Sequence, residues 1–219
     1  MFENDVFQLR PGLSFRFEMI AEGLPVIIVD DLYQRPDEIR AAALSLNYEP
    51  GPLGYPGRVA PAPRGNASLG RFLGELLALV NNQYLPRVPI AADGKRIANF
   101  SRMYTDFALV DMHPDDLSAP QRAPHIDPIP IFGLVYLNHE ERGGTLFFRR
   151  TGEGETAAEN QGYQTQSGGG YELCGRIEPA FNRLAIYPGF VHHSGEIGSW
   201  IETEERFTSP RLTQRLMFF

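Results

Sequence analysis

Residues 123–138 read "APHIDPIPIFGLVYLN", so a histidine and an aspartate stand one residue apart just before an apolar run. Successive side chains of an extended chain point to opposite faces, and His125 and Asp127 therefore share one face while Ile126 points to the other. The prolines around this pair fit a surface turn, which is one interpretation. The other is that the imidazole and the carboxylate are two ligands of one metal ion, and the rest of the sequence has to decide between them.

The apolar run belongs to a second half of the chain that is rich in short strand-like segments. From about residue 97, apolar or alternating segments are separated by turn residues at fairly regular intervals, as in all-β sandwiches and barrels. Upstream, residues 24–33 are a β-branched run that predicts a buried strand. Residues 35–47 and 68–85 have the pattern of helices, and Ser68 is the expected cap of the second one.

Length and composition fit a single globular unit. The 219 residues suit one domain over residues 1–219, in which residues 1–96 support a β core formed by residues 97–219. Hydrophobic residues at 42% and charged residues at 21% are ordinary for such a protein. The net charge of −7 and the lack of a long basic run argue against a general surface for nucleic acids or anionic membranes.

Cysteine content and the N-terminus bear on the cellular location. A lone cysteine, Cys174, excludes an internal disulfide and a zinc site built from cysteines, and it fits a reducing compartment. The acidic N-terminus "MFENDVFQLRPG" lacks the form of a signal peptide, and the run "LPVIIVDDL" is too short to span a bilayer. These features predict a cytoplasmic protein.

A second candidate for metal binding lies far along the chain, in "YPGFVHHSGEI" (187–197). Two histidines and one carboxylate on one face of an iron(II) ion leave three coordination positions open for other ligands. His125 and Asp127 could supply two of these ligands, and the third should come from a distant strand. In an extended chain His192 and His193 point to opposite faces, so only one of them can reach the site.

The last segment, "SPRLTQRLMFF" (209–219), has an alternating pattern that places Arg211, Thr213 and Arg215 on one face. A planar guanidinium suits a carboxylate better than an ammonium does, and a neighbouring hydroxyl can add a hydrogen bond. The Arg-x-Thr pair could therefore hold the carboxylate of a ligand. A surface strand with basic residues on its solvent side is the alternative interpretation.

These segments together resemble the iron(II)/2-oxoglutarate-dependent dioxygenases, especially the prolyl-hydroxylase-like branch. The matching stretches are "HID", "YLN" followed by "GGTLFF", "YPGFVHHSG" and "RLT", which span residues 125–213 in this order. The stretch "VIIVDDLYQRPDEIRAAAL" also resembles the strand and helix that often precede this core. The resemblance implies a mainly β fold with N-terminal helices, in which a double-stranded β-helix (a jelly-roll, cupin-like core) is flanked by helices and holds iron at one open end.

The resemblance also implies which side chains bind iron. His125 and Asp127 match the first two ligands. His193 matches the third, because "HSG" resembles the small residue and glycine that follow this ligand, and His192 is the fallback.

For 2-oxoglutarate, Arg211 matches the arginine that binds the distal carboxylate, and Thr213 matches its hydroxyl neighbour. Tyr136 stands where several relatives place a tyrosine on the same carboxylate, although a strand tyrosine packed in the core fits equally well. The distance from His193 to Arg211 along the chain is longer than relatives usually show, and Arg206 with Thr208 forms a second Arg-x-Thr pair. Arg211 is preferred because it opens an alternating strand.

The implied activity is that of an oxygenase that uses Fe(II), the co-substrate 2-oxoglutarate and O2. It hydroxylates an unactivated C–H bond of a small molecule or peptide and releases succinate and CO2. Retention of Asp127 favours hydroxylation, because halogenases of this class leave that position open for halide. Two alternatives stay open: a non-redox jelly-roll protein that binds a ligand, and a cupin-like metal enzyme that does not use 2-oxoglutarate. The Arg211–Thr213 pair argues against the second.

Some remaining features have a structural and a functional interpretation. His113 and His139 stand in charged or turn-like contexts, and we expect both to be structural. The Pro/Gly loop 48–66 and the polar, Gly-rich stretch 151–170 could form walls or a lid over the iron, or plain surface. Trp200 could face the substrate, although a loop tryptophan is more often a packing anchor.

Overall fold

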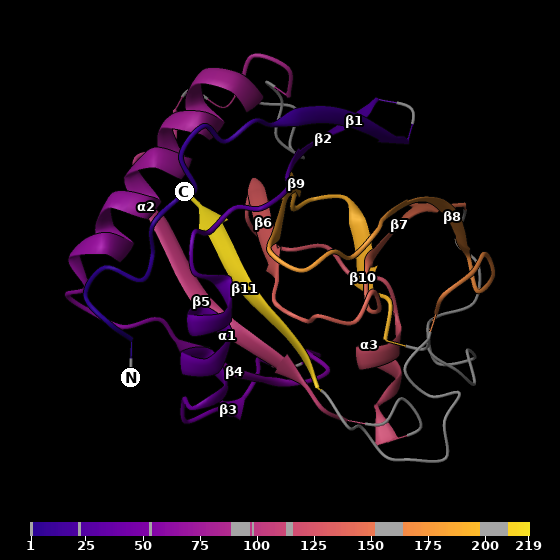
Figure 1. Ribbon diagram of the computed structural model, residues 1–219. Coiled ribbons are helices and arrows are strands. Elements are labelled where there is room, and N and C mark those ends of the chain that lie inside the picture. The colour runs from indigo at the N-terminus through magenta and orange to yellow at the C-terminus, as the bar shows by residue number, and fades with distance from the viewer. Residues whose placement is uncertain are drawn as a thin grey trace.

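Two antiparallel sheets form the core of the protein in a computed structural model (Figure 1), which describes residues 2–21, 23–52, 54–88, 97, 99–112, 116–151, 164–197 and 210–219. The main sheet contains, in spatial order, β1 (Arg16–Ala21), β2 (Leu24–Val29), β9 (Arg183–Pro188), β6 (Ile131–Tyr136), β11 (Arg211–Phe218), β5 (Met103–Val110), β4 (Arg58–Pro61) and β3 (Glu49–Pro50). The small sheet contains β10 (His192–Gly195), β7 (Thr145–Arg150) and β8 (Tyr171–Ile177).

From β5 onwards the chain passes repeatedly between the two sheets. β5, β6, β9 and β11 lie in the main sheet, whereas β7, β8 and β10 form the small one. A bridge between His125 and His193 adds the segment before β6 to the edge of the small sheet, with reciprocal N···O distances of 3.0 and 2.8 Å. This path is that of a double-stranded β-helix, so the predicted fold class, mainly β with a jelly-roll core and N-terminal helices, is confirmed.

The two faces of the main sheet are covered differently (Figure 1). The helices α1 (Pro36–Leu44) and α2 (Ala67–Leu79) pack on one face, where Ile39 and Phe72 join a core with residues of the sheet. A second core between the two sheets contains Phe132 and Phe147. Every residue of β6 is consequently buried, which explains its continuous apolar sequence. The remaining helical turns are η1 (Val80–Tyr84), a π-helical turn, and α3 (Ala119–Arg122).

The start of α2 differs from the prediction. The N-cap is Asn66, whose side-chain oxygen accepts a hydrogen bond from the backbone N–H of Leu69 at 3.0 Å. The prediction that Ser68 caps this helix is therefore wrong. Its hydroxyl is buried in the first turn, where it accepts a hydrogen bond from the N–H of Phe7 at 3.2 Å and donates one to Asn66. Both residue types are good caps, and the contact with Phe7, distant in sequence, is available only to Ser68.

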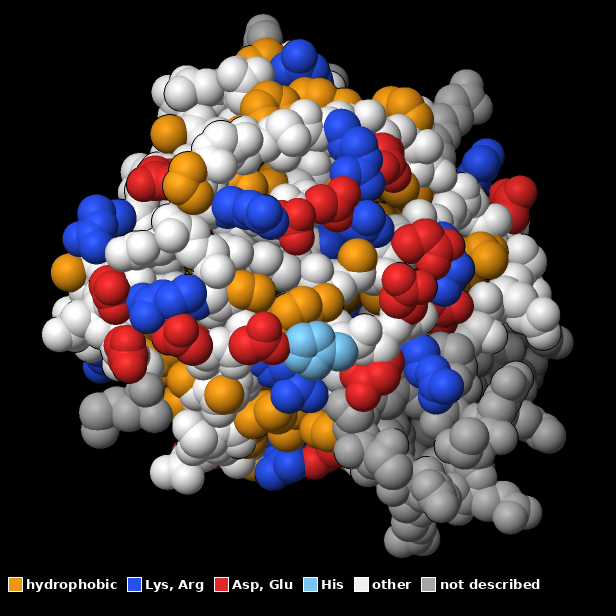
Figure 2. Space-filling view, viewed as in Figure 1, with side chains coloured by type: hydrophobic (Ala, Val, Ile, Leu, Met, Phe, Trp, Pro, Cys, Tyr) orange, Lys and Arg blue, Asp and Glu red, His pale blue; other side chains and the backbone are white. Residues whose placement is uncertain are grey.

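The surface mixes charges of both signs. On the face shown in Figure 2, the acidic and basic side chains of the described residues are interspersed. Across the described part of the chain, no helix has the length and apolar character needed to cross a membrane.

Candidate active site

The backbone around the bridge brings three potential metal ligands to one place. His125 and Asp127 lie on the segment that leads into β6, and the N–H of Asp127 donates to the carbonyl of Gly189 at 2.8 Å. This pairing keeps the segment extended, so both side chains lie on one face, as the sequence predicts. Ile126 points away and is 51% exposed. His193, on the neighbouring strand β10, is the bridge partner of His125.

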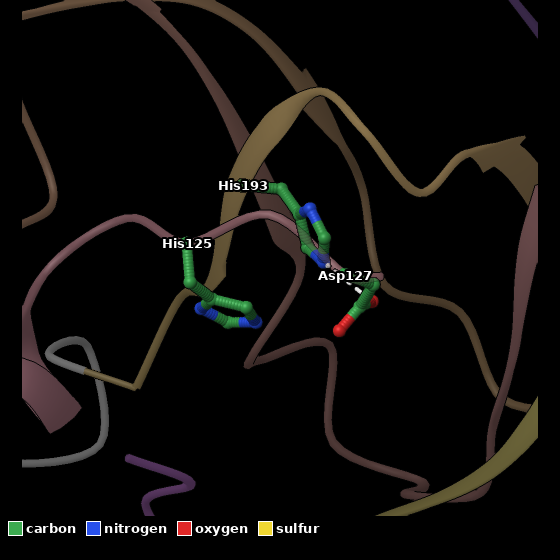
Figure 3. A group of neighbouring side chains, drawn as sticks. All are labelled: His125, Asp127 and His193. Carbon is green, nitrogen blue, oxygen red and sulfur yellow. Dashed lines mark ion pairs between the residues drawn. The ribbon is translucent and has the colours of Figure 1, made fainter. Parts of the chain in front are cut away.

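The three side chains point towards one another (Figure 3). One ligand atom of each of His125, Asp127 and His193 lies within 4.8 Å of the other two. Nε2 of His193 is 3.3 Å from Oδ2 of Asp127, and the two imidazole rings are 4.7 Å apart between centroids. His193 is buried whereas His125 is exposed, so the group is open on one side.

Hydrogen bonding orients the histidine on β10. Nδ1 of His193 lies 2.8 Å from the carbonyl oxygen of Val191, and a carbonyl can only accept a hydrogen bond. Nδ1 therefore donates to this carbonyl, and Nε2 faces Asp127 and the centre of the group. Metal-binding histidines commonly have such a second contact, which fixes the ring and the tautomer.

The pKa values of His125 and Asp127 suit the binding of a cation. Part of His125 faces solvent, but the surrounding protein disfavours its charged form. This burial, together with the nearby His193, lowers the pKa of His125 to about 4. Burial raises the pKa of Asp127, but its close contact with His193 and the nearby His125 and Arg215 outweigh this and lower the pKa overall. At neutral pH His125 is therefore neutral and Asp127 ionised, as metal ligands must be.

Arg211, the predicted carboxylate-binding residue, is a buried cation at the start of β11, with an exposed fraction of 5%. Its Nε donates to the carbonyl of Gly143 at 2.6 Å, and its Nη2 to that of Gly144 at 3.4 Å. The guanidinium lies 5.8 Å from the centre of the Tyr136 ring. Among the described residues, no carboxylate forms an ion pair with it. A buried charge of this kind is costly without a partner, which indicates a site for an anion.

The other two predicted co-substrate residues lie beside this guanidinium. Thr213 is buried, and it is opposite Tyr136 in the register of β11 with β6. The hydroxyl of Tyr136 is 2.7 Å from that of Thr145, and its ring belongs to the core between the sheets. Tyr136 therefore packs in the core, and its contact with the co-substrate stays a prediction.

One pocket connects the metal-ligand group to Arg211. Its wall includes Thr213 on β11, Thr145 on β7, and Phe132 and Leu134 on β6. The residues placed apart in the sequence, from 125 to 213, thus surround a single space between the two sheets. The arrangement can hold a divalent cation at one end and a carboxylate at the other.

Sequence reasoning missed part of this wall. Arg215 was recognised only as sharing a face with Arg211, but in the pocket it forms a two-pronged ion pair with Asp106 on β5, at 2.7 and 2.6 Å. Tyr55, from the loop 48–66, lies with its ring 4.9 Å from the Arg215 guanidinium and lines the same pocket. The Pro/Gly composition of the loop suggested a wall, but no local signal identified Asp106.

Two other histidines that the structure describes, His192 and His139, stay outside the metal-ligand group. His192 has its ring against Tyr171, 5.4 Å between centroids, so the structure selects His193 of the adjacent pair. His139 lies on the surface, with Nε2 2.9 Å from a carboxylate oxygen of Asp37. His113 lies outside the described residues.

Some other predictions also fall outside the described residues. These are the alternative pair Arg206 and Thr208, the tryptophan Trp200, and most of the stretch 151–170.

Comparisons with known proteins give the following. No curated protein matches this chain. Among solved structures, it is similar to a prolyl-4-hydroxylase from Pseudomonas putida (16% identity over 84% of this chain and 86% of that chain, TM-score 0.42). It is also similar to a prolyl hydroxylase from Trichoplax adhaerens in complex with a peptide fragment of hypoxia inducible factor (13% identity, 89% and 83%, TM-score 0.47). HygX from Streptomyces hygroscopicus, with nickel and 2-oxoglutarate bound, is similar as well (12% identity, 90% and 83%, TM-score 0.47).

A family match covers nearly the whole length. Residues 11–162 and 150–218 match a family of unknown function (DUF6445), so the match includes all three potential metal ligands and Arg211. The chain therefore belongs to the DUF6445 family.

Proposed function

We propose that this protein is an Fe(II)- and 2-oxoglutarate-dependent oxygenase that hydroxylates an unactivated C–H bond of a small molecule or peptide. One observation carries the proposal. A single pocket joins the His125–Asp127–His193 group to Arg211, a buried guanidinium that has no counter-ion among the described residues. The His125–Asp127–His193 group would bind a metal ion, and Arg211 would bind a carboxylate of a dicarboxylic acid.

The metal end fits iron(II) in the type and state of its donors. Two imidazoles and one carboxylate form the ligand set of non-heme iron oxygenases, which leaves three positions for other ligands. His125, Asp127 and His193 would hold the ion, with His193 already oriented by the carbonyl of Val191. The exposed side of the group, at His125, gives a route for other molecules to reach the ion.

The anion end fits the distal carboxylate of 2-oxoglutarate. Arg211 would pair with it, and the Thr213 hydroxyl can donate a further hydrogen bond. The charges then balance, because the positive charges of iron(II) and Arg211 equal the negative charges of Asp127 and the dicarboxylate. A cupin-like metal enzyme without 2-oxoglutarate would have no use for the buried Arg211 charge, so this alternative is disfavoured.

The chemistry and the role of the protein can be separated. When bound, Fe(II) with 2-oxoglutarate and dioxygen supplies the oxidation, which is coupled to release of succinate and CO2. The residues of the chain position the ligands and exclude water. Phe132 and Leu134 form an apolar wall of the pocket, so the charges in it interact through a medium with little water and their attraction is strengthened.

Thermal unfolding with Mn(II), 2-oxoglutarate and both together tests the proposal. A ligand that binds only the native state raises its stability, by about 2.7 kcal/mol at a concentration one hundred times its Kd. We expect Mn(II) to raise the Tm, and 2-oxoglutarate to raise it further only when Mn(II) is present. His125→Ala should abolish both increases, whereas His139→Ala, which changes a surface histidine, should preserve them.

An activity measurement complements the binding test. With Fe(II), the wild-type protein should form succinate from 2-oxoglutarate, and His125→Ala should not. If 2-oxoglutarate fails to stabilise the Mn(II)-loaded protein and no succinate is formed with any candidate substrate, the protein is not an oxygenase of this type.

A further inference from the structure

The hydroxyl of Tyr187 is a buried polar group without a hydrogen-bond partner among the described residues. Tyr187 lies on β9 and has an exposed fraction of 0%. Its ring packs against Phe147, His193 and Phe132, with centroid distances of 5.1, 5.2 and 5.7 Å. A phenylalanine would make the same apolar contacts, so the packing explains the ring and leaves the hydroxyl unexplained.

The fold satisfies the hydroxyls of its other fully buried tyrosines. Tyr33 donates to Oε1 of Gln214 at 2.5 Å, and Tyr84 donates to the carbonyl of Pro25 at 2.8 Å. The Tyr136 hydroxyl bonds with that of Thr145 at 2.7 Å. Buried polar groups are nearly always paired because loss of hydration is costly, so an exception needs a specific explanation.

The position of Tyr187 supplies one, because this residue lines the pocket that joins the metal-ligand group to Arg211. Burial raises the pKa of Tyr187 well above its ordinary value, and the Asp127 carboxylate raises it further, whereas Arg211 acts in the opposite direction. Tyr187 therefore belongs to the same pocket wall as Asp127 and Arg211. A tyrosine hydroxyl can donate one hydrogen bond.

Other buried atoms without a partner do not share this position. Nε of Arg40 and Oγ of Ser194 also lack a hydrogen-bond partner among the described residues, but neither residue lines the pocket. Among the residues that the structure describes, Tyr187 is the only one that lines the pocket and also has a buried polar atom without a hydrogen-bond partner.

We propose that Tyr187 is a further co-substrate-binding residue, whose hydroxyl donates a hydrogen bond to an oxygen of the 2-oxo acid held between the metal and Arg211. The inference rests on the proposed function, since it requires that acid. It adds a third protein donor, after Arg211 and Thr213, and this one comes from a different strand. A hydrogen bond from a neutral donor to an ionised oxygen is stronger than one between neutral groups, which would offset the cost of burying the hydroxyl.

Tyr187→Phe tests the proposal, with Tyr33→Phe as the matched control. Both substitutions remove one buried hydroxyl, but that of Tyr33 is bonded to Gln214 in the core on the helical side of the main sheet. We expect Tyr187→Phe to leave the Tm of the ligand-free protein unchanged or higher, and to preserve the increase caused by Mn(II). The Kd of the Mn(II)-loaded protein for 2-oxoglutarate, measured by calorimetry, should rise about tenfold. Tyr33→Phe should lower the Tm and leave that Kd unchanged.

The outcomes separate this inference from the proposed function. If wild-type protein binds 2-oxoglutarate with Mn(II) and Tyr187→Phe binds it equally well, the role of Tyr187 is refuted and the proposed function stands. A lower Tm for ligand-free Tyr187→Phe, as in Tyr33→Phe, would show a structural hydrogen bond and also refute the role. If wild-type protein does not bind 2-oxoglutarate, both proposals fail.

Discussion

At the scale of single residues, two arginines on one strand have different partners and therefore different uses. Arg211 and Arg215 are four residues apart on β11 and face the same pocket. Arg215 is neutralised by the two-pronged contact with Asp106, whereas the hydrogen bonds of the Arg211 guanidinium within the described residues go to the carbonyls of Gly143 and Gly144. Carbonyls orient a guanidinium without cancelling its charge. Under the proposed function, this positive charge would pair with the carboxylate of 2-oxoglutarate.

Arg211→Lys tests this use of the charge. Lysine keeps the charge but loses the planar fork that pairs with a carboxylate through two hydrogen bonds. We expect the Kd of the Mn(II)-loaded protein for 2-oxoglutarate to rise at least about tenfold, which corresponds to about 1.4 kcal/mol. The increase in Tm caused by Mn(II) alone should not change. The control is Arg149→Lys, because Arg149 is exposed on β7. Unchanged binding by Arg211→Lys would mean that the acid lies elsewhere.

At the scale of elements, β1 of the main sheet packs closely on β8 of the small sheet. A Cβ atom added to Gly175 would lie 2.3 Å from the carbonyl oxygen of Ile20, far closer than atoms can approach. The glycine on β8 therefore allows the two sheets to meet at this edge. This contact joins the edge strand of the main sheet to the edge strand of the small sheet that carries His193.

Gly175→Ala should separate these strands. Overpacking of this kind costs about 1–3 kcal/mol, so we expect the free energy of unfolding in urea to fall by this amount. The control is Gly74→Ala in α2, where an added Cβ meets nothing within 4 Å. That substitution should raise the stability by about 0.5–1 kcal/mol, because alanine favours the helix. Equal stability of Gly175→Ala and the wild type would show that β1 moves freely relative to β8.

At the scale of the whole molecule, the N-terminal region and the β core share one sheet. β2 pairs with β9, and β4 pairs with β5, so strands from residues 1–96 extend the main sheet at both edges. The helices from the same region cover one face of that sheet. We expect residues 1–219 to form a single domain, because the N-terminal region and the β core share one hydrophobic core.

Calorimetric unfolding tests the single domain. We expect one transition, in which the calorimetric and van 't Hoff enthalpies agree, because the two regions share their core. Mn(II) with 2-oxoglutarate should move the whole transition to a higher temperature. Two separate transitions, only one of which responds to the ligands, would divide the chain into two independent units.

The sequence by itself determined the features that depend on local backbone geometry. Alternation in an extended chain placed His125 and Asp127 on one face, and it put Arg211, Thr213 and Arg215 together. It also required that only one of the adjacent histidines His192 and His193 could reach the site. The pattern of short strands, with the resemblance, gave the fold class, which the structure confirms.

Only the tertiary structure decided which groups meet across the sheets. It selected His193, brought Asp106 to Arg215, and placed Tyr187 in the pocket wall with a hydroxyl that has no hydrogen-bond partner among the described residues. The physical reason is that these contacts depend on strand register and on the packing of two sheets, which join residues far apart in the chain. A local pattern fixes the direction of a side chain, but its partner is fixed by the fold as a whole.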